Sequence, residues 1–148
     1  MMVVVDANVL VSSLLTRSAS FEVFLLNRIF KRFEFLAPEF LLAELEKHKE
    51  ELIKESRLSS GEFDEVLEFL LEDITFVPAS QFSDRLPEAR KLLSAHNKDE
   101  PYLALSLKLD SCPIFSGDKA FKAKSPVQVL SPRELLDKMS GKSWESPE

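Results

Sequence analysis

The chain has 148 residues, of which 45% are apolar and 30% are charged, and its formal net charge is −6. This composition predicts one soluble globular domain with a core of its own and excludes a disordered or fibrous protein. The negative charge also argues against a protein that coats nucleic acid through bulk charge, because such binding depends on neutralised phosphates.

Residue counts narrow the class further. The single cysteine, Cys112, leaves no intrachain disulfide, and three glycines leave no Gly-rich phosphate-binding loop. No apolar run approaches the ~20 residues of a membrane span, and no basic segment precedes a short apolar one as in a signal peptide. We therefore expect a cytoplasmic protein that does not enter a membrane.

Strands and helices alternate through the first half of the chain. The β-branched run at residues 2–5 predicts a strand buried on both faces, as in the centre of a parallel sheet. The patterns that follow predict a helix from about Val9, interrupted at 16–20 and resumed at 21–31, a strand at 33–38, one helix at 38–56 with Pro38 in its first turn, and a helix at 59–73 opened by Ser59 or Ser60.

The second half continues the alternation. Its patterns predict a strand at 74–78, a helix from Leu86 to about Ala95, a helix from Glu100 to 109, a strand at 112–116, a tight turn at 117–121, a strand at 127–130, and a closing helix at 131–139 with Ser131 as cap and Pro132 first. Residues 1–140 are thus expected to form one domain, followed by a flexible tail at 141–148.

Strands separated by helices imply crossover connections, and hence a three-layer α/β fold with a central parallel sheet flanked by helices. In such sheets the ligand crevice lies at the carboxyl ends of the strands, where the strand order reverses. Asp6 directly follows the first predicted strand, and Asp118 follows the strand at 112–116 by two residues. Both carboxylates are therefore expected on the same rim of the sheet.

Each acid that could join this rim also has a plain structural explanation. Asp6 and Asp99 precede predicted helices, where Asp is a preferred N-cap, and Asp118 suits a turn. Glu44 borders the apolar stripe of its helix and could simply be solvated. If the carboxylates converge, two like charges ~4 Å apart repel by about 4 kcal/mol at an effective dielectric near 20, so the cluster would need cations. Oxygen ligands suit Mg²⁺ or Mn²⁺, whereas zinc favours His or Cys.

Four stretches of the chain together resemble the PIN-domain family of metal-dependent nucleases: "VVVDANVLVSSLL", "APEFLLAELEKHKEEL", "NKDEPYLALSLKL" and "PIFSGDKAF". The resemblance extends to about Leu136, keeps four acids in the family order, and is close to a prokaryotic subgroup with a helical pair between the second and third motifs. It implies a compact α/β fold with an acidic pocket that uses Mg²⁺ or Mn²⁺, one ion or two.

The resemblance assigns catalytic and metal-binding roles to four acids: Asp6, Glu44, Asp99 and Asp118. It gives Asn8 and Ser116 supporting positions around the carboxylates. The chain departs from the family at two sites, because Ala7 stands where Thr is frequent and Lys98 stands where the subgroup often has another acid. Glu100 is a partial substitute for that acid.

The implied reaction is endonucleolytic hydrolysis of single-stranded RNA that leaves a 5′-phosphate and a 3′-hydroxyl. In this interpretation one metal, held chiefly by Asp6, Asp99 and Asp118, activates a water for in-line attack, and a second near Glu44 stabilises the leaving oxygen. Contacts to RNA phosphates are expected from four basic side chains: Lys119, Lys122, Lys124 and Arg17. The ring of Phe21 is expected to stack on a base.

Two alternatives from other classes stay open. A PIN fold could bind RNA or a protein without cleaving, although such a module would not need four mutually repelling acids. A metal-dependent phosphatase would use Asp6 as nucleophile and would want an acid at position 8, where the chain has Asn8.

The setting of the protein is inferred from the resemblance alone. Small PIN proteins often act as toxins held inactive by an antitoxin, usually as dimers, so an antitoxin partner and a homodimer are expected. The candidates for a dimer surface, or equally for the core, are Phe24, Phe30, Phe63 and Phe69.

Overall fold

The computed structural model describes residues 1–93 and 97–140 of the chain. The predicted tail at 141–148 and the predicted helix end at Ala95 lie outside the described residues. The α-helices and strands of the described residues are, in chain order, β1 (Met2–Val5), α1 (Ala7–Leu15), α2 (Ala19–Phe30), β2 (Glu34–Pro38), α3 (Phe40–Lys47), α4 (Lys49–Ser56), α5 (Ser60–Glu72), β3 (Ile74–Val77), α6 (Leu86–Leu93), α7 (Glu100–Lys108), β4 (Ile114–Phe115), α8 (Lys119–Lys124), β5 (Val129–Leu130) and α9 (Pro132–Met139).

The five strands form one parallel sheet in the order β3-β2-β1-β4-β5. β1 is central, and Val3, Val4 and Val5 have no exposed surface. The β-branched run is therefore a strand covered on both faces, as predicted. The strand order reverses at β1, because β2 lies on one side of it and β4 on the other. A crevice is expected at the carboxyl ends of these two central strands, β1 and β4.

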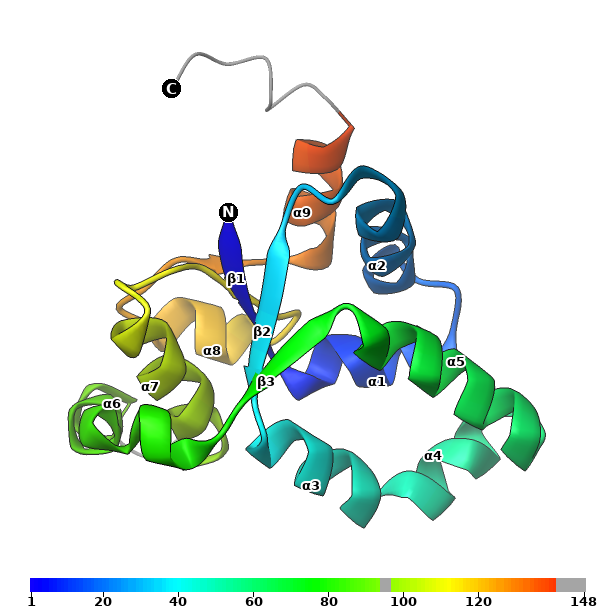
Figure 1. The fold of residues 1–148 in the computed structure, drawn as a ribbon, viewed down its shortest axis with the longest axis horizontal. Coiled ribbons are helices and arrows are strands. Elements are labelled where there is room, and N and C mark those ends of the chain that lie inside the picture. Colours follow the sequence, from blue (N-terminus) through cyan, green and yellow to red (C-terminus); the bar gives the residue numbers. More distant parts are fainter. Residues whose placement is uncertain (94–96, 141–148) are drawn as a thin grey trace.

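Helices cover both faces of the sheet, which confirms the predicted three-layer α/β fold. In Figure 1, α1, α2 and α9 lie on one side of the strands and α6, α7 and α8 on the other. The Phe24 ring of α2 meets Phe35 of β2 and Phe115 of β4, at centroid separations of 5.3 and 5.6 Å. On the opposite face, α7 packs against β1 and β2 and buries Tyr102 and Leu103.

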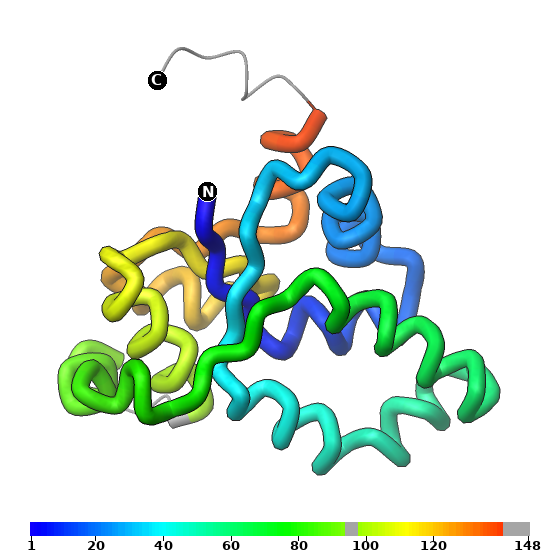
Figure 2. Tube along the Cα trace, viewed as in Figure 1, coloured from blue at the N-terminus to red at the C-terminus, as the bar shows by residue number. Residues whose placement is uncertain are grey.

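The segment α3–α5 forms an excursion between β2 and β3 that projects to one side of the sheet (Figure 2). The prediction of one helix at 38–56 was wrong, because the helix breaks at His48, where φ is −109° and ψ is 10°. A straight helix of that length would run ~28 Å and leave the domain. The break instead lets α3 bury Leu45 and α4 bury Leu52 in the same core. Pro38 ends β2 and does not lie in a helix.

A second correction concerns residues 117–121, which were predicted as a tight turn. The chain instead enters the short helix α8 at Lys119. Asp118 caps this helix, since one of its carboxylate oxygens accepts hydrogen bonds from two backbone N–H groups. Phe121, which is 1% exposed, fixes the helix to the core.

Other helix starts agree with the sequence. Ser59 at α5 and Ser131 at α9 each form a capping box with the glutamate three residues later, and Pro132 occupies the first position of α9. α1 and α2 begin two residues earlier than predicted, at Ala7 and Ala19.

The aromatic residues proposed for a dimer surface divide between core and surface. Phe24 and Phe63 are buried, Phe69 is half-buried, and Phe30 is 54% exposed beside the exposed Ile29 of α2. Within residues 1–93 and 97–140, no single helix is long and apolar enough to cross a membrane. Only α1 and α2 taken together reach that length and composition, across a bend of 100°.

Candidate active site

The site is built where β1 and β4 end side by side. The register pairs Val5 with Phe115, so the next residues, Asp6 and Ser116, meet at the same rim. The Asp6 backbone N–H donates to the Phe115 carbonyl at 3.0 Å, which continues the strand pairing up to the acid itself. The predicted placement of Asp6 at a carboxyl-terminal edge of the sheet is confirmed.

Asp6 does not act as a helix cap, although it occupies the position before α1. Its carboxylate makes no capping hydrogen bond. One oxygen, Oδ2, instead accepts a hydrogen bond of 2.7 Å from the Ser116 hydroxyl, and the residue is only 6% exposed. The backbone N–H of Asn8 also lies close enough to the carboxylate to lower its pKa.

Ser116 and Asn8 hold the loop that leads from β4 to Asp118. The Ser116 oxygen also accepts from the Asp118 backbone N–H at 3.1 Å, so one hydroxyl links two of the acids. The Asn8 side-chain oxygen accepts from the Gly117 N–H at 3.1 Å and lies 3.5 Å from the Ser116 hydroxyl. Asn8 thus orients the β4–α8 turn and offers no acid for protonating a leaving alcohol.

Asp118 serves a structural purpose as well as facing the site. Its Oδ1 accepts from the backbone N–H groups of Ala120 and Phe121, at 2.9 and 3.1 Å. The sequence analysis offered turn chemistry for Asp118, and the structure shows a helix cap instead. These two hydrogen bonds fix the direction of the side chain. Because a carboxylate has a second oxygen, capping α8 leaves Oδ2 able to bind a cation.

Asp99 sits at the start of α7 and is not a cap either. Its backbone is helical, its side chain makes no capping hydrogen bond, and it is only 8% exposed. The sequence left open that Asp99 caps its helix, and the structure shows that it does not. A buried carboxylate with no capping contact is available for a ligand.

The electrostatics tie these three acids together. Burial, opposed by the Ser116 hydrogen bond and reinforced by the Asp99 charge, raises the pKa of Asp6 from 3.8 to about 6. Burial and the charge of Asp118, opposed by Lys98, raise the pKa of Asp99 from 3.8 to about 6. Without a cation, each ionised carboxylate disfavours the others. Neighbouring acids with raised pKa values are typical of functional sites.

Glu44, the fourth predicted acid, approaches the site from α3. It is half-buried, and no hydrogen bond or ion pair involves it within the described part of the chain. It contributes to a hollow of about 240 Å³ that is also lined by Ala7 at the start of α1 and by His48. Glu44 is therefore near the acids of the rim without being bound to any of them.

Tyr102 is a site residue that the sequence analysis missed. It is 1% exposed, and among the described residues its hydroxyl has no hydrogen-bond partner. Burial and the charges of Asp6, Glu44 and Asp99, in that order after burial, raise the pKa of this phenol. The signal in the sequence was its place three residues after Asp99, which puts both side chains on one face of the helix start.

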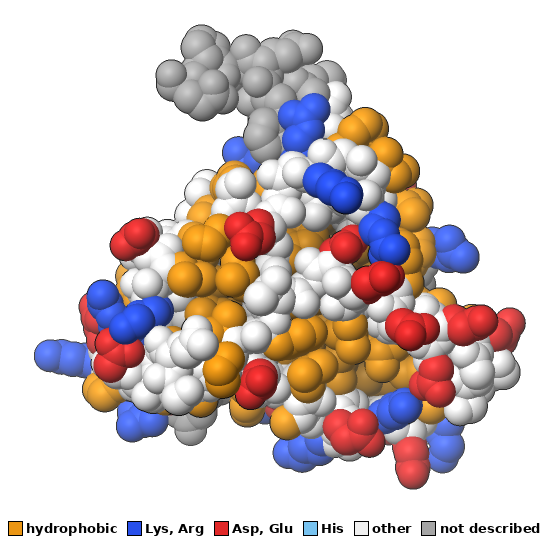
Figure 3. Space-filling model, in the orientation of Figure 1, with side chains coloured by type: hydrophobic (Ala, Val, Ile, Leu, Met, Phe, Trp, Pro, Cys, Tyr) orange, Lys and Arg blue, Asp and Glu red, His pale blue; other side chains and the backbone are white. Residues whose placement is uncertain are grey.

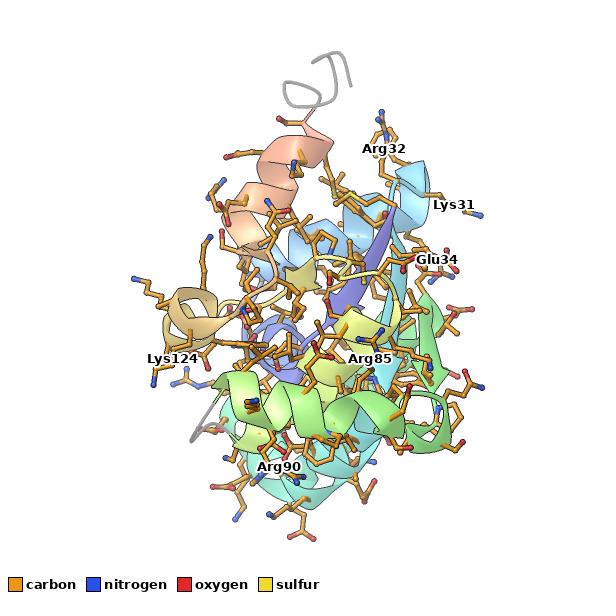
Figure 4. All side chains as sticks on the ribbon, turned by 90° about the vertical axis from the view of Figure 1, so that its left-hand side faces the viewer. Lys31, Arg32, Glu34, Arg85, Arg90 and Lys124 are labelled. Carbon is orange, nitrogen blue, oxygen red and sulfur yellow. The ribbon has the colours of Figure 1, made fainter. Side chains whose placement is uncertain are left out.

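Glu100, the proposed substitute acid, is directed elsewhere. Its Oε1 accepts from the Arg90 side chain at 3.2 Å, and its Oε2 is buried with no partner in residues 1–93 and 97–140. Arg90 extends from α6 across to the start of α7, on the face turned to the viewer in Figure 4. Glu100 thus joins α6 to α7, and its predicted supporting part in the site stays a prediction.

The predicted basic contacts differ in their availability. Lys122 forms an ion pair with Glu134 of α9, and the Arg17 guanidinium lies over the Phe21 ring, 4.8 Å from its centroid. Arg17 follows the end of α1, about 14 Å of helix away from Asp6. Lys119 opens α8 directly after Asp118 and is exposed. Lys124 ends the same helix at the edge of the molecule (Figure 4).

The surface charge is mixed on the face that Figure 3 shows. On the face in Figure 3, basic side chains stand among acidic ones and form no continuous patch. α5 contains five acidic residues and no lysine or arginine. This face therefore offers no continuous basic surface for a phosphate backbone.

The donor set of the rim fits a divalent cation. The acids supply only oxygen ligands, which suit Mg²⁺ or Mn²⁺, and the charges of neighbouring carboxylates raise the pKa values of Asp6 and Asp99. Within residues 1–93 and 97–140, no three acidic, histidine or cysteine side chains already surround one point at metal-binding distance. The residue types therefore fit the cation, although their side chains do not converge on one point in this structure.

A parallel α/β fold with interacting carboxylates where its strand order reverses defines a candidate metal-dependent enzyme. A comparison with protein families matches residues 4–138 to the PIN domain. The chain belongs to the PIN-domain family, as its motifs indicated, and members of this family are generally nucleases that use divalent metals. A search of curated proteins gives no match.

Proposed function

We propose that the protein is an endoribonuclease that hydrolyses phosphodiester bonds in single-stranded RNA with the help of Mg²⁺ or Mn²⁺. The observation that carries the proposal is the interaction of three buried or capping acids, Asp6, Asp99 and Asp118, at the carboxyl ends of β1 and β4. Membership of the PIN-domain family gives this acidic rim its chemical interpretation.

Each residue of the rim has a definite task in this proposal. Asp6 presents Oδ1 to the cation while Ser116 holds Oδ2. Asp99 and Asp118 supply further carboxylate oxygens, and Asn8 keeps the β4–α8 turn in place. Lewis-acid activation of a water and of the scissile phosphate is the chemistry that a bound cation supplies. Lys119, next to Asp118, is suited to contact an RNA phosphate.

Cleavage of an end-labelled single-stranded RNA by the purified protein tests the proposal. The wild type should cut with Mn²⁺ or Mg²⁺ and not with EDTA, and Asp6→Asn should lose the activity. Asp137→Asn, which changes an exposed aspartate on α9, is the matched control and should cut normally. Equal cutting by the wild type and Asp6→Asn would identify a contaminant and refute the assignment.

A PIN-fold module that binds RNA or protein without cleaving is the second candidate. The observation in its favour is that the acids of the described residues do not yet surround a common point. Calorimetric titration with Mn²⁺ separates the two functions, since a module without catalysis need not bind the ion. A phosphatase is less favoured, because Asn8 accepts a hydrogen bond from Gly117 and supplies no acid.

We propose a cytoplasmic setting in which the protein forms a homodimer and is regulated by an antitoxin. The exposed apolar side chains of α2, Leu25, Ile29 and Phe30, support a homodimer, because water-exposed apolar surface favours association. Sedimentation of the wild type and of Ile29→Glu tests the dimer. Co-purification with the product of an adjacent gene tests the antitoxin.

A further inference from the structure

The buried hydroxyl of Tyr102 is unexplained by packing. The ring is held at the start of α7 and meets Phe40 of α3 edge-on, with centroids 6.1 Å apart and planes at 70°. The hydroxyl itself is inaccessible to water, and no residue that the structure describes forms a hydrogen bond with it. A phenylalanine would fill the same space without burying an unsatisfied polar atom, which is destabilising. The hydroxyl therefore points to a contact that forms in another state of the site.

The surroundings of the hydroxyl limit what that contact can be. The backbone N–H of Ala7 lies near it but can only donate, so the phenolic proton still lacks an acceptor. The acceptors close enough to influence the phenol are the carboxylates of Asp6, Glu44 and Asp99. Asp6 already uses one oxygen for Ser116 and has only the other for a cation.

Glu44 is the acceptor that fits best. No hydrogen bond or ion pair within the described residues involves it, so a donor without an acceptor and an acceptor without a donor lie near each other. Glu44 is one helical turn after Phe40, whose ring already contacts the Tyr102 ring, so α3 brings both side chains to the same side of the tyrosine.

We propose that Tyr102 is a positioning residue, whose hydroxyl donates a hydrogen bond to the Glu44 carboxylate when a divalent cation is bound and so fixes Glu44 beside the acids of the rim. The inference rests on the metal site of the proposed function. It adds a residue that links α7 to α3 and explains how the one acid with no contact to the rim joins it.

Titration calorimetry with Mn²⁺, in the absence of RNA, tests the inference on the wild type, Tyr102→Phe, Glu44→Ala and the double variant. Tyr102→Phe should bind Mn²⁺ 10-fold to 100-fold more weakly, the usual effect of removing a group that orients a ligand. In the Glu44→Ala background the same change should have no further effect, because Tyr102 acts through Glu44. Ser13→Ala is the matched control, since it removes a buried hydroxyl that is already satisfied by the Val9 carbonyl.

Thermal unfolding in EDTA separates positioning from packing. The melting temperature of Tyr102→Phe should equal or exceed that of the wild type, because the variant removes an unsatisfied polar group. A lower melting temperature, unchanged Mn²⁺ affinity, or an equal loss of affinity with and without Glu44 would overturn the inference. Wild type that binds Mn²⁺ but does not cut RNA would refute the proposed nuclease and leave the test of Tyr102 intact, whereas wild type that binds no Mn²⁺ would overturn both.

Discussion

Replacing Asp6 by asparagine is expected to stabilise the metal-free protein while it removes activity. The pKa of Asp6 is raised from 3.8 to about 6, chiefly by burial. At roughly 1.4 kcal/mol for each pH unit, keeping this side chain ionised in the folded state costs about 3 kcal/mol. Asparagine carries no charge and keeps an oxygen to accept the Ser116 hydrogen bond. Asp6→Asn should therefore raise the free energy of unfolding by up to about 3 kcal/mol at pH 8.

The sign of the pH dependence follows from the raised pKa. The folded wild type holds the Asp6 proton more tightly than the unfolded chain, so this group stabilises the fold below pH 3.8 and loses that contribution as the pH rises through about 6. The advantage of Asp6→Asn should be largest at pH 8 and should nearly vanish at pH 4. Urea unfolding in EDTA at both pH values measures it.

Two controls complete this experiment. Asp137→Asn, at an exposed position, should change the stability little at either pH. Addition of Mn²⁺ should stabilise the wild type by mass action and leave Asp6→Asn unchanged. The reasoning fails if Asp6→Asn is the less stable protein at pH 8, or if its advantage does not depend on pH.

Three further predictions concern the neighbouring residues. Because the pKa of Asp99 is about 6, Mn²⁺ affinity measured by calorimetry should fall as the pH drops below 6 and protons compete for the carboxylate; an affinity constant from pH 8 to 5 would contradict this. Ser116→Ala, which frees Asp6 Oδ2, should weaken Mn²⁺ binding 10-fold to 100-fold, and unchanged binding would refute the orienting role. In cleavage assays Lys119→Ala should raise the KM for RNA more than Lys122→Ala, whose partner is Glu134; the reverse order would assign the phosphate contact to Lys122.

The central part of the site was predictable because it depends on the sheet. A run of buried β-branched residues identified β1, and the acid at its end fell on the rim that parallel topology assigns to ligands. Asp118 could be placed at the same rim by its distance from β4. The pairing of Asp6 with Ser116 follows from the register of β1 and β4. The sequence indicated a role for Ser116 only through the family resemblance.

The sequence could not decide between capping and ligand roles for the acids. Asp is favoured at a helix start for its capping bonds, yet Asp6 and Asp99 make none, whereas Asp118 makes two. This difference depends on side-chain direction, which neighbouring elements set. Whether Glu44 belongs to the site likewise depends on how α3 approaches the rim. A helical pattern in the sequence does not reveal the position of the helix relative to the sheet.

The errors in the fold have local causes. The helical periodicity runs through His48 without interruption, so the sequence did not indicate the break. The break results from the packing of α3 and α4 on one core. At Gly117 and Asp118 the residues that favour a turn are also the residues that start a helix, and the buried Phe121 decides for α8. Tyr102 was missed because an aromatic residue in an apolar helix usually belongs to the core. Its ring does belong to the core, and its buried hydroxyl is what sets it apart from a core phenylalanine.

The most direct test of the central claim is the anomalous scattering of Mn²⁺ in crystals of the wild type grown with the ion. The account predicts a peak bound by Asp6 Oδ1, with carboxylate oxygens of Asp99 and Asp118 around it. A Mn²⁺ peak away from these acids, or none at an ion concentration that supports RNA cleavage, would contradict the assignment of the rim as the metal site.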